Sequence, residues 1–187
     1  SLQTSVSNVA VALSYIEGTS GSGNVITNST VASSSAMTLV ASKPTVTVSS
    51  TQGGTLVLGA ENKIGEFTVA ADANGKVAVA STTFSLSAIG VSTSSFGSFR
   101  LADGNTTISS ASVSTSTQTN AIVTFVPGYE ISAGQSKTFS LYAVVNGSAQ
   151  SGITPYVASS LSSSGFKWVD VIGGNSGFTG ASIVNFP

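Results

Sequence analysis

Carboxylates and lysines are the side chains through which this chain could do chemistry, because the sequence contains no histidine and no cysteine. Disulfides, cysteine nucleophiles, histidine-based triads and the usual zinc ligands are therefore excluded. Glu61, Glu66 and Asp170 are the candidates for a pair of carboxylates that act as general acid and base. The whole chain has only seven acidic residues, so a surface or loop-anchoring role is the favoured interpretation. We expect no catalytic residue, no cofactor and no enzymatic activity.

Lysines and loop aspartates offer two further kinds of chemistry. Lys63 or Lys137 could form an isopeptide bond with an asparagine, assisted by a buried carboxylate, although simple surface lysines are the favoured interpretation. Asp72-Ala73-Asn74-Gly75 and Asp103-Gly104-Asn105 resemble the first half of a calcium loop. A calcium site needs about six to eight oxygen ligands, including a late carboxylate, and neither stretch supplies one. We interpret both stretches as turns and expect no metal site.

Aromatic residues and sequons are the candidate sites for carbohydrate. Phe166 and Trp168 could form a stacking platform for a sugar, but aromatic residues at strand spacing are more typical of a core. Asn28, Asn105 and Asn146 each begin an Asn-X-Ser/Thr sequon. Because about a third of the chain is Ser or Thr, chance matches are expected, and glycosylation at these positions stays an open alternative.

The low content of charged residues limits the kinds of partner that the chain could bind. Charged residues make up 7% of the sequence and the net charge is −1, whereas soluble domains have about 25% charged residues. The chain lacks the basic surface that binds nucleic acid or an anionic membrane. It also lacks a run of about 18 apolar residues that could span a bilayer. A surface built from Ser and Thr is common in proteins that are covered by glycans or by neighbouring subunits.

Residues 120–145 contain the clearest pair of strands. Apolar and polar residues alternate with a period of two on both sides of a short connection, which is typical of strands with one buried face. Pro127-Gly128 and Ala133-Gly134 predict turns, and Ile131 is placed to bury its side chain beneath the connection.

Short strands of the same kind follow one another through residues 43–187, and no segment has a helical period. Asp72-Ala73-Asn74-Gly75 predicts a hairpin in which Val77 and Val79 pair back on the preceding strand. The inward side changes from odd to even residues before Phe84, which predicts a bulge or a change of sheet near residues 80–83. Residues 106–119 are either an edge strand or a loop. The predicted core is Val46, Val48, Phe67, Val69, Phe84, Leu86, Phe99, Val123, Phe125, Phe139, Leu141 and Trp168.

Residues 1–42 form an extension before this region. Residues 8–16 predict a strand with Val9, Val11, Leu13 and Tyr15 on one face and small residues on the other. Residues 18–35 are rich in Gly, Ser, Thr and Asn and predict a long flexible linker. The strand at residues 8–16 could be donated to a neighbouring copy, or it could be the first strand of its own module.

Four stretches resemble a known family. They are the Pro-led strand at residues 44–49, GAENKIGEF at 59–67, ISAGQSKTFSL at 131–141, and GFKWVD at 165–170 with the closing Phe186-Pro187. Together they resemble the Ig-like modules of large secreted surface proteins from ultrasmall candidate-phylum bacteria. The resemblance covers residues 43–187 and implies an extracellular, cell-surface β-sandwich with a structural or adhesive role and no catalytic residues.

The sequence therefore predicts an all-β chain, with an antiparallel Ig-like β-sandwich at residues 43–187 and an N-terminal strand extension. We expect a structural subunit of a pilus-like filament or surface layer, in which copies polymerise by donating residues 8–16. A carbohydrate-binding or adhesive module is the alternative, and an exposed aromatic cluster would favour it.

Overall fold

The structure, a computed structural model, describes residues 8–9, 16–28, 37–38, 40, 42–49, 55–117, 119–171 and 175–179. The chain divides into two compact units, Ser1–Val40 and Ala41–Pro187.

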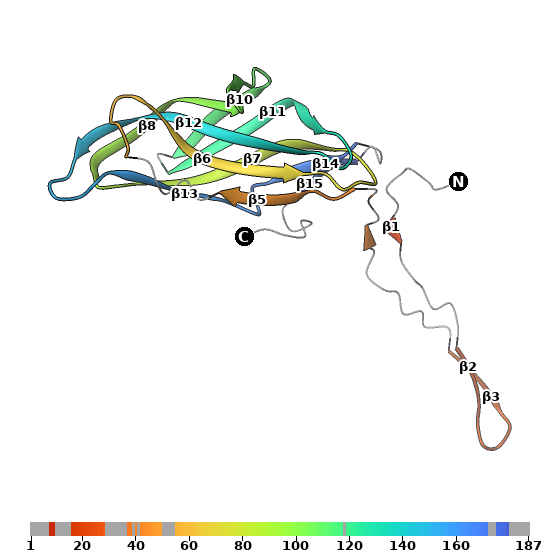
Figure 1. Cartoon of the computed structure of the whole chain (residues 1–187). Helices are drawn as coiled ribbons and strands as arrows, with labels where there is room; N and C mark the ends of the chain where they lie inside the picture. Colours follow the sequence, from red (N-terminus) through yellow and green to blue (C-terminus); the bar gives the residue numbers. More distant parts are fainter. Residues whose placement is uncertain are drawn as a thin grey trace. The chain divides into compact units, whose positions relative to one another are not determined.

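The second unit is an antiparallel β-sandwich of two sheets, and the described residues contain no helix, so the predicted all-β fold is confirmed (Figure 1). The six-stranded sheet contains β10 (Ala111–Thr117), β11 (Asn120–Ile131), β7 (Val77–Ile89), β14 (Lys167–Asp170) and β15 (Asn175–Thr179) in that order, with β13 (Tyr156–Leu161) also paired to β7. The five-stranded sheet has the order β5 (Thr45–Ser49), β6 (Glu61–Ala70), β12 (Ser136–Ala149), β8 (Val91–Asp103) and β9 (Thr106–Thr107).

Strand β7 is the centre of the six-stranded sheet. One of its edges pairs with β11, and the other edge pairs first with β14 and then with β13. The predicted change of phase is present, because Val77 and Val79 are buried before residue 80 and Thr82, Phe84 and Leu86 are buried after it. The ladder to β14 shifts register at this point, as a β-bulge requires.

Ten of the twelve predicted core residues are buried, and Phe67, Phe84, Phe139 and Trp168 have no exposed surface. Val48 and Phe99 are only half-buried, so these two predictions are wrong. Phe99 follows Ser98, which has a positive φ of 48°, and the β8–β12 ladder shifts register beside them. This bulge shifts the alternation of inward and outward side chains, so Phe99 no longer falls on an inward position. Val48 is only half-buried because it is near the end of the edge strand β5.

Two predicted turns have a different role from the one expected. Asp72 does begin a turn, with its carbonyl accepting the Gly75 N–H at 3.3 Å, but the turn carries the chain from β6 in one sheet to β7 in the other. Val77 and Val79 therefore do not pair back on β6, and the hairpin prediction is wrong. Pro127 and Gly128 lie within β11, at an irregularity in its ladder with β7, and the connection to β12 comes after Ile131, which is buried as expected.

The first unit contains two short antiparallel ladders. Strand β1 (Asn8–Val9) pairs with β4 (Met37–Thr38), and β2 (Ile16–Thr19) pairs with β3 (Val25–Asn28). Part of the predicted linker at residues 18–35 is therefore a β-hairpin. Six residues separate β1 from β2 and eight separate β3 from β4. The β2–β3 pair therefore lies between β1 and β4 in the sequence, and the two pairings are nested.

Candidate functional site

The outward face of the five-stranded sheet carries a group of charged side chains, and a bulge in β6 puts three of them, Glu61, Lys63 and Glu66, on that face. Ile64 and Gly65 are both buried although they are neighbours in the chain, and the ladder to β12 shifts register there. The odd-numbered Glu61 and Lys63 and the even-numbered Glu66 consequently share the outward side.

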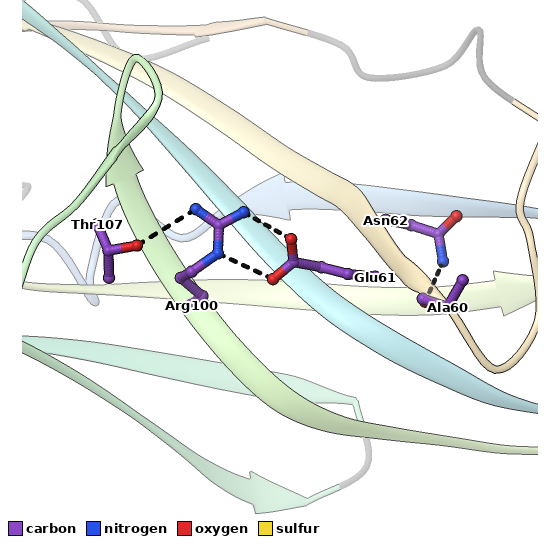
Figure 2. A network of polar contacts seen from close by, with 5 residues as sticks. All are labelled: Ala60, Glu61, Asn62, Arg100 and Thr107. Atoms are coloured by element: carbon purple, nitrogen blue, oxygen red, sulfur yellow. Dashed lines mark hydrogen bonds and ion pairs between the residues drawn. The ribbon is translucent and has the colours of Figure 1, made fainter.

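Arg100 is the centre of the first polar cluster on this face (Figure 2). Its Nε donates to Glu61 Oε1 at 2.8 Å and its Nη2 donates to Glu61 Oε2 at 2.6 Å, while Thr107 Oγ1 accepts from Nη1 at 3.5 Å. The guanidinium also lies 4.1 Å from the centre of the Tyr142 ring, within the range of a cation–π contact. The hydrogen bond from Arg100 lowers the pKa of Glu61, and the same bond raises the pKa of Arg100.

A second cluster on the same face joins Glu66 to Lys63 and Ser140. Lys63 Nζ donates to the Glu66 carboxylate, and Ser140 Oγ donates to Glu66 Oε2 at 3.0 Å. These contacts lower the pKa of Glu66, with the Lys63 hydrogen bond as the largest cause.

The third cluster lies at the end of β8. Lys137 Nζ and the Tyr129 hydroxyl both donate to Asp103 Oδ2, at 2.7 Å and 3.0 Å. The pKa of Asp103 is lowered, mainly by the Lys137 hydrogen bond, while burial and the Asp103 carboxylate raise the pKa of Tyr129. The first cluster connects β6 to β8 across β12, the second connects β6 to β12, and the third connects β8 and β12 to Tyr129 of β11 in the other sheet. Each carboxylate in the three clusters has a cationic partner.

The fold does not bring the candidate acid and base residues together. Glu61 and Glu66 are in β6 of the five-stranded sheet, whereas Asp170 is buried in β14 of the other sheet. The described residues contain no group of three His, Cys, Asp or Glu side chains that could hold a metal ion. Lys63 and Lys137, the candidates for an isopeptide bond, contact carboxylates and not asparagines in the hydrogen bonds described above. Glu61, Glu66, Lys63 and Lys137 therefore take part in ion pairs between strands.

Phe166 and Trp168 are both fully buried, so the preferred interpretation as core residues is confirmed. The sequon residues Asn105 and Asn146 are exposed, the first in the turn between β8 and β9 and the second in β12. The side chain of Asn28 lies outside the described residues, although its backbone ends β3.

The predicted donor strand is described only in part. Val9 lies in β1, where its backbone pairs with Met37, and its side chain is outside the described residues. Val11, Leu13 and Tyr15 are outside them altogether, as is the closing segment at residues 181–187. In the described part of the extension, Glu17 is the one charged side chain.

Charged residues are also distributed unevenly between strands. None of the four strands that end the two sheets, β10, β15, β5 and β9, contains a charged residue. Natural sheets often protect such edges with Lys, Pro or bulges, because an open edge pairs readily with another chain. Residues 106–119 were predicted to be either an edge strand or a loop, and they contain the edge strands β9 and β10. The other two edges and the Arg100 cluster were not predicted, since both depend on which strands become neighbours. The lack of charge at residues 111–117 was a further signal for the edge at β10.

A shallow hollow of about 330 Å³ lies on the outward side of the six-stranded sheet. Hydroxyl and amide side chains from β7, β11 and β13 dominate its lining, including Ser85, Ser87, Asn120 and Ser160, and no aromatic or charged side chain contributes.

Neither a protein-family model nor a curated protein nor a solved structure matches the chain. No helix in the described residues is long and apolar enough to cross a membrane.

Proposed function

We propose that this chain is a structural subunit of an extracellular, pilus-like filament or surface layer. Copies are joined when the strand at residues 8–16 of one copy adds to the sandwich of the next. The role follows the resemblance of the sandwich to Ig-like modules of bacterial surface proteins.

The N-terminal unit is the observation that carries this proposal. It is a compact unit of its own, yet its described ladders contain only two and four residue pairs. A two-stranded ribbon is marginally stable in water because it cannot bury an apolar face by itself. Adding one of its strands to a larger sheet satisfies main-chain groups and buries Val9, Val11, Leu13 and Tyr15. A contact of this head-to-tail kind that does not close on itself produces a filament.

The distribution of charge supports the same role. The charged side chains on the five-stranded sheet are already paired within one copy, so little electrostatic repulsion opposes the approach of another copy. Assembly through backbone hydrogen bonds and apolar area depends weakly on salt, because few charges are involved.

Removal of the donor strand tests the proposal. We expect the full chain to form polymers that are visible by negative-stain electron microscopy and that sediment rapidly. A chain lacking residues 1–20 should remain monomeric. Leu13→Lys should act like the deletion, since it places a charge on the apolar face, whereas Ser14→Lys on the opposite face is the matched control. Polymers that form equally well without residues 1–20 would show that donation is wrong.

The neutral hollow on the six-stranded sheet supports the alternative, a carbohydrate-binding or adhesive module. Its hydroxyl and amide lining suits an uncharged polyol, although it lacks the aromatic side chain on which sugars usually stack. Binding of the full chain to a glycan array, lost on Asn120→Ala, would favour this role. Polymerisation with no glycan binding would favour the filament.

A further inference from the structure

Strand β10 ends the six-stranded sheet and is open along its outer side. It pairs with β11 over residues 111–117, and no other described strand pairs with it. Across the sandwich it lies close to β8, which belongs to the five-stranded sheet. A strand added along β10 would therefore meet the seam between the two sheets.

The direction of the main-chain groups of β10 follows from one hydrogen bond beyond its ladder. Val126 N–H donates to the Ser110 carbonyl at 2.9 Å, so these two residues form a hydrogen-bonded pair in the register that continues into β10. Hydrogen-bonded pairs alternate along an antiparallel ladder. Ser112 and Ser114 consequently direct their N–H and C=O groups to β11, and Val113 and Thr115 direct theirs outward.

The outward groups of Val113 and Thr115 have no backbone partner among the described residues. Two successive outward residues present two donors and two acceptors, which is enough to begin a ladder with an incoming strand. The side chain of Val113 faces the sandwich interior and is half-buried, so it marks an apolar margin that an added strand would cover.

β10 has none of the protection found on β8, another strand with an open outer side. Beyond Ala102 and Asp103, which pair with β9, β8 has no partner on that side in the described chain. Thr93 and Ser98 of β8 have positive φ angles, its ladder to β12 shifts register twice, and it contains Arg100. Bulges and charges of this kind prevent edge pairing. β10 contains no charge and no proline, and its one irregularity lies at its last residues.

We propose that the outer edge of β10 is the acceptor for residues 8–16 of a second copy, an inference that rests on the filament function proposed above. The occupant and the acceptor fit each other in charge and length. Neither contains a charged residue, and a nine-residue donor spans roughly 30 Å against roughly 23 Å for β10, at about 3.3 Å per residue. In this arrangement Val9, Val11, Leu13 and Tyr15 enter the seam beside Val113.

Thr115→Pro tests the acceptor. The side chain is exposed and the N–H points outward, so proline removes a donor from the edge and leaves the ladder to β11 intact. We expect this variant to lose polymerisation at least tenfold while its Tm stays within about 4 °C of the parent. Ser114→Lys, which adds a charge to the same edge, should have the same effect. Ser87→Lys, at an exposed position of the inner strand β7, is the matched control and should polymerise normally.

Mixing two variants separates the acceptor from the donor. Thr115→Pro keeps its donor strand, and Leu13→Lys keeps its acceptor edge, so each alone should be monomeric. Together they should form a one-to-one complex in analytical ultracentrifugation. If Thr115→Pro and Ser114→Lys polymerise like the parent while Leu13→Lys does not, β10 is not the acceptor and the filament function stands. If the parent itself stays monomeric, both proposals are overturned.

Discussion

Gly65→Ala should destabilise the sandwich, because Gly65 lies at the β6 bulge directly beneath an aromatic ring. A Cβ atom at this position would be 2.8 Å from Cε1 and 3.1 Å from Cδ1 of Phe84. Phe84 is fully buried, and its ring makes an edge contact with Phe67 at a centroid distance of 5.6 Å. The ring therefore has little room to move away from an added methyl group.

The expected change in the free energy of unfolding is the difference of two opposing effects. Overpacking of a buried site costs about 1–3 kcal/mol. Replacing glycine by alanine also reduces the conformational entropy of the unfolded chain, which stabilises the folded state by about 0.4–1 kcal/mol. We expect a net loss of about 1–2 kcal/mol in the free energy of unfolding, which lowers Tm by about 2–8 °C for a domain of this size.

Urea unfolding measures this loss, with the fluorescence of the buried Trp168, the single tryptophan of the chain, as a probe. Gly97→Ala in β8 is the matched control. Gly97 is a strand glycine of the same sheet with no atom within 4 Å of its Cβ position, so the substitution should be neutral or slightly stabilising. A Gly65→Ala chain as stable as the parent, or an equal loss in Gly97→Ala, would refute the packing argument.

Three further predictions concern the core and the charged face. Phe139→Ala should lower the free energy of unfolding in urea by about 3–5 kcal/mol, since the ring is fully buried against three other rings. Phe99→Ala should lower it clearly less, because Phe99 is half-exposed. Carboxylates with a lowered pKa in the folded state stabilise it above their unfolded pKa, so stability should fall as the pH drops below about 4. Asp103→Asn should flatten that fall, and an unchanged pH profile in this variant would contradict the assignment. Intact mass should show no loss of ammonia, because Lys63 and Lys137 are paired with carboxylates; a loss would reveal an isopeptide bond.

Much of the fold could be predicted from the sequence, because a strand with one buried face shows a local alternation of apolar and polar residues. Alternation with a period of two identified the strands on both sides of Ile131, and the change of phase before Phe84 indicated a bulge that is present. Ten of the twelve predicted core residues are buried for the same reason.

The choice of strand partners was decided by the tertiary structure. The turn at Asp72 has the residues of a hairpin, yet it joins two different sheets. Glu61 and Arg100 are 39 positions apart and meet only because β6 and β8 both flank β12. The open edge of β10 likewise depends on its place at the end of a sheet. Strands pair through main-chain groups that are the same in every residue, so the sequence records which face is buried but not which strand lies alongside.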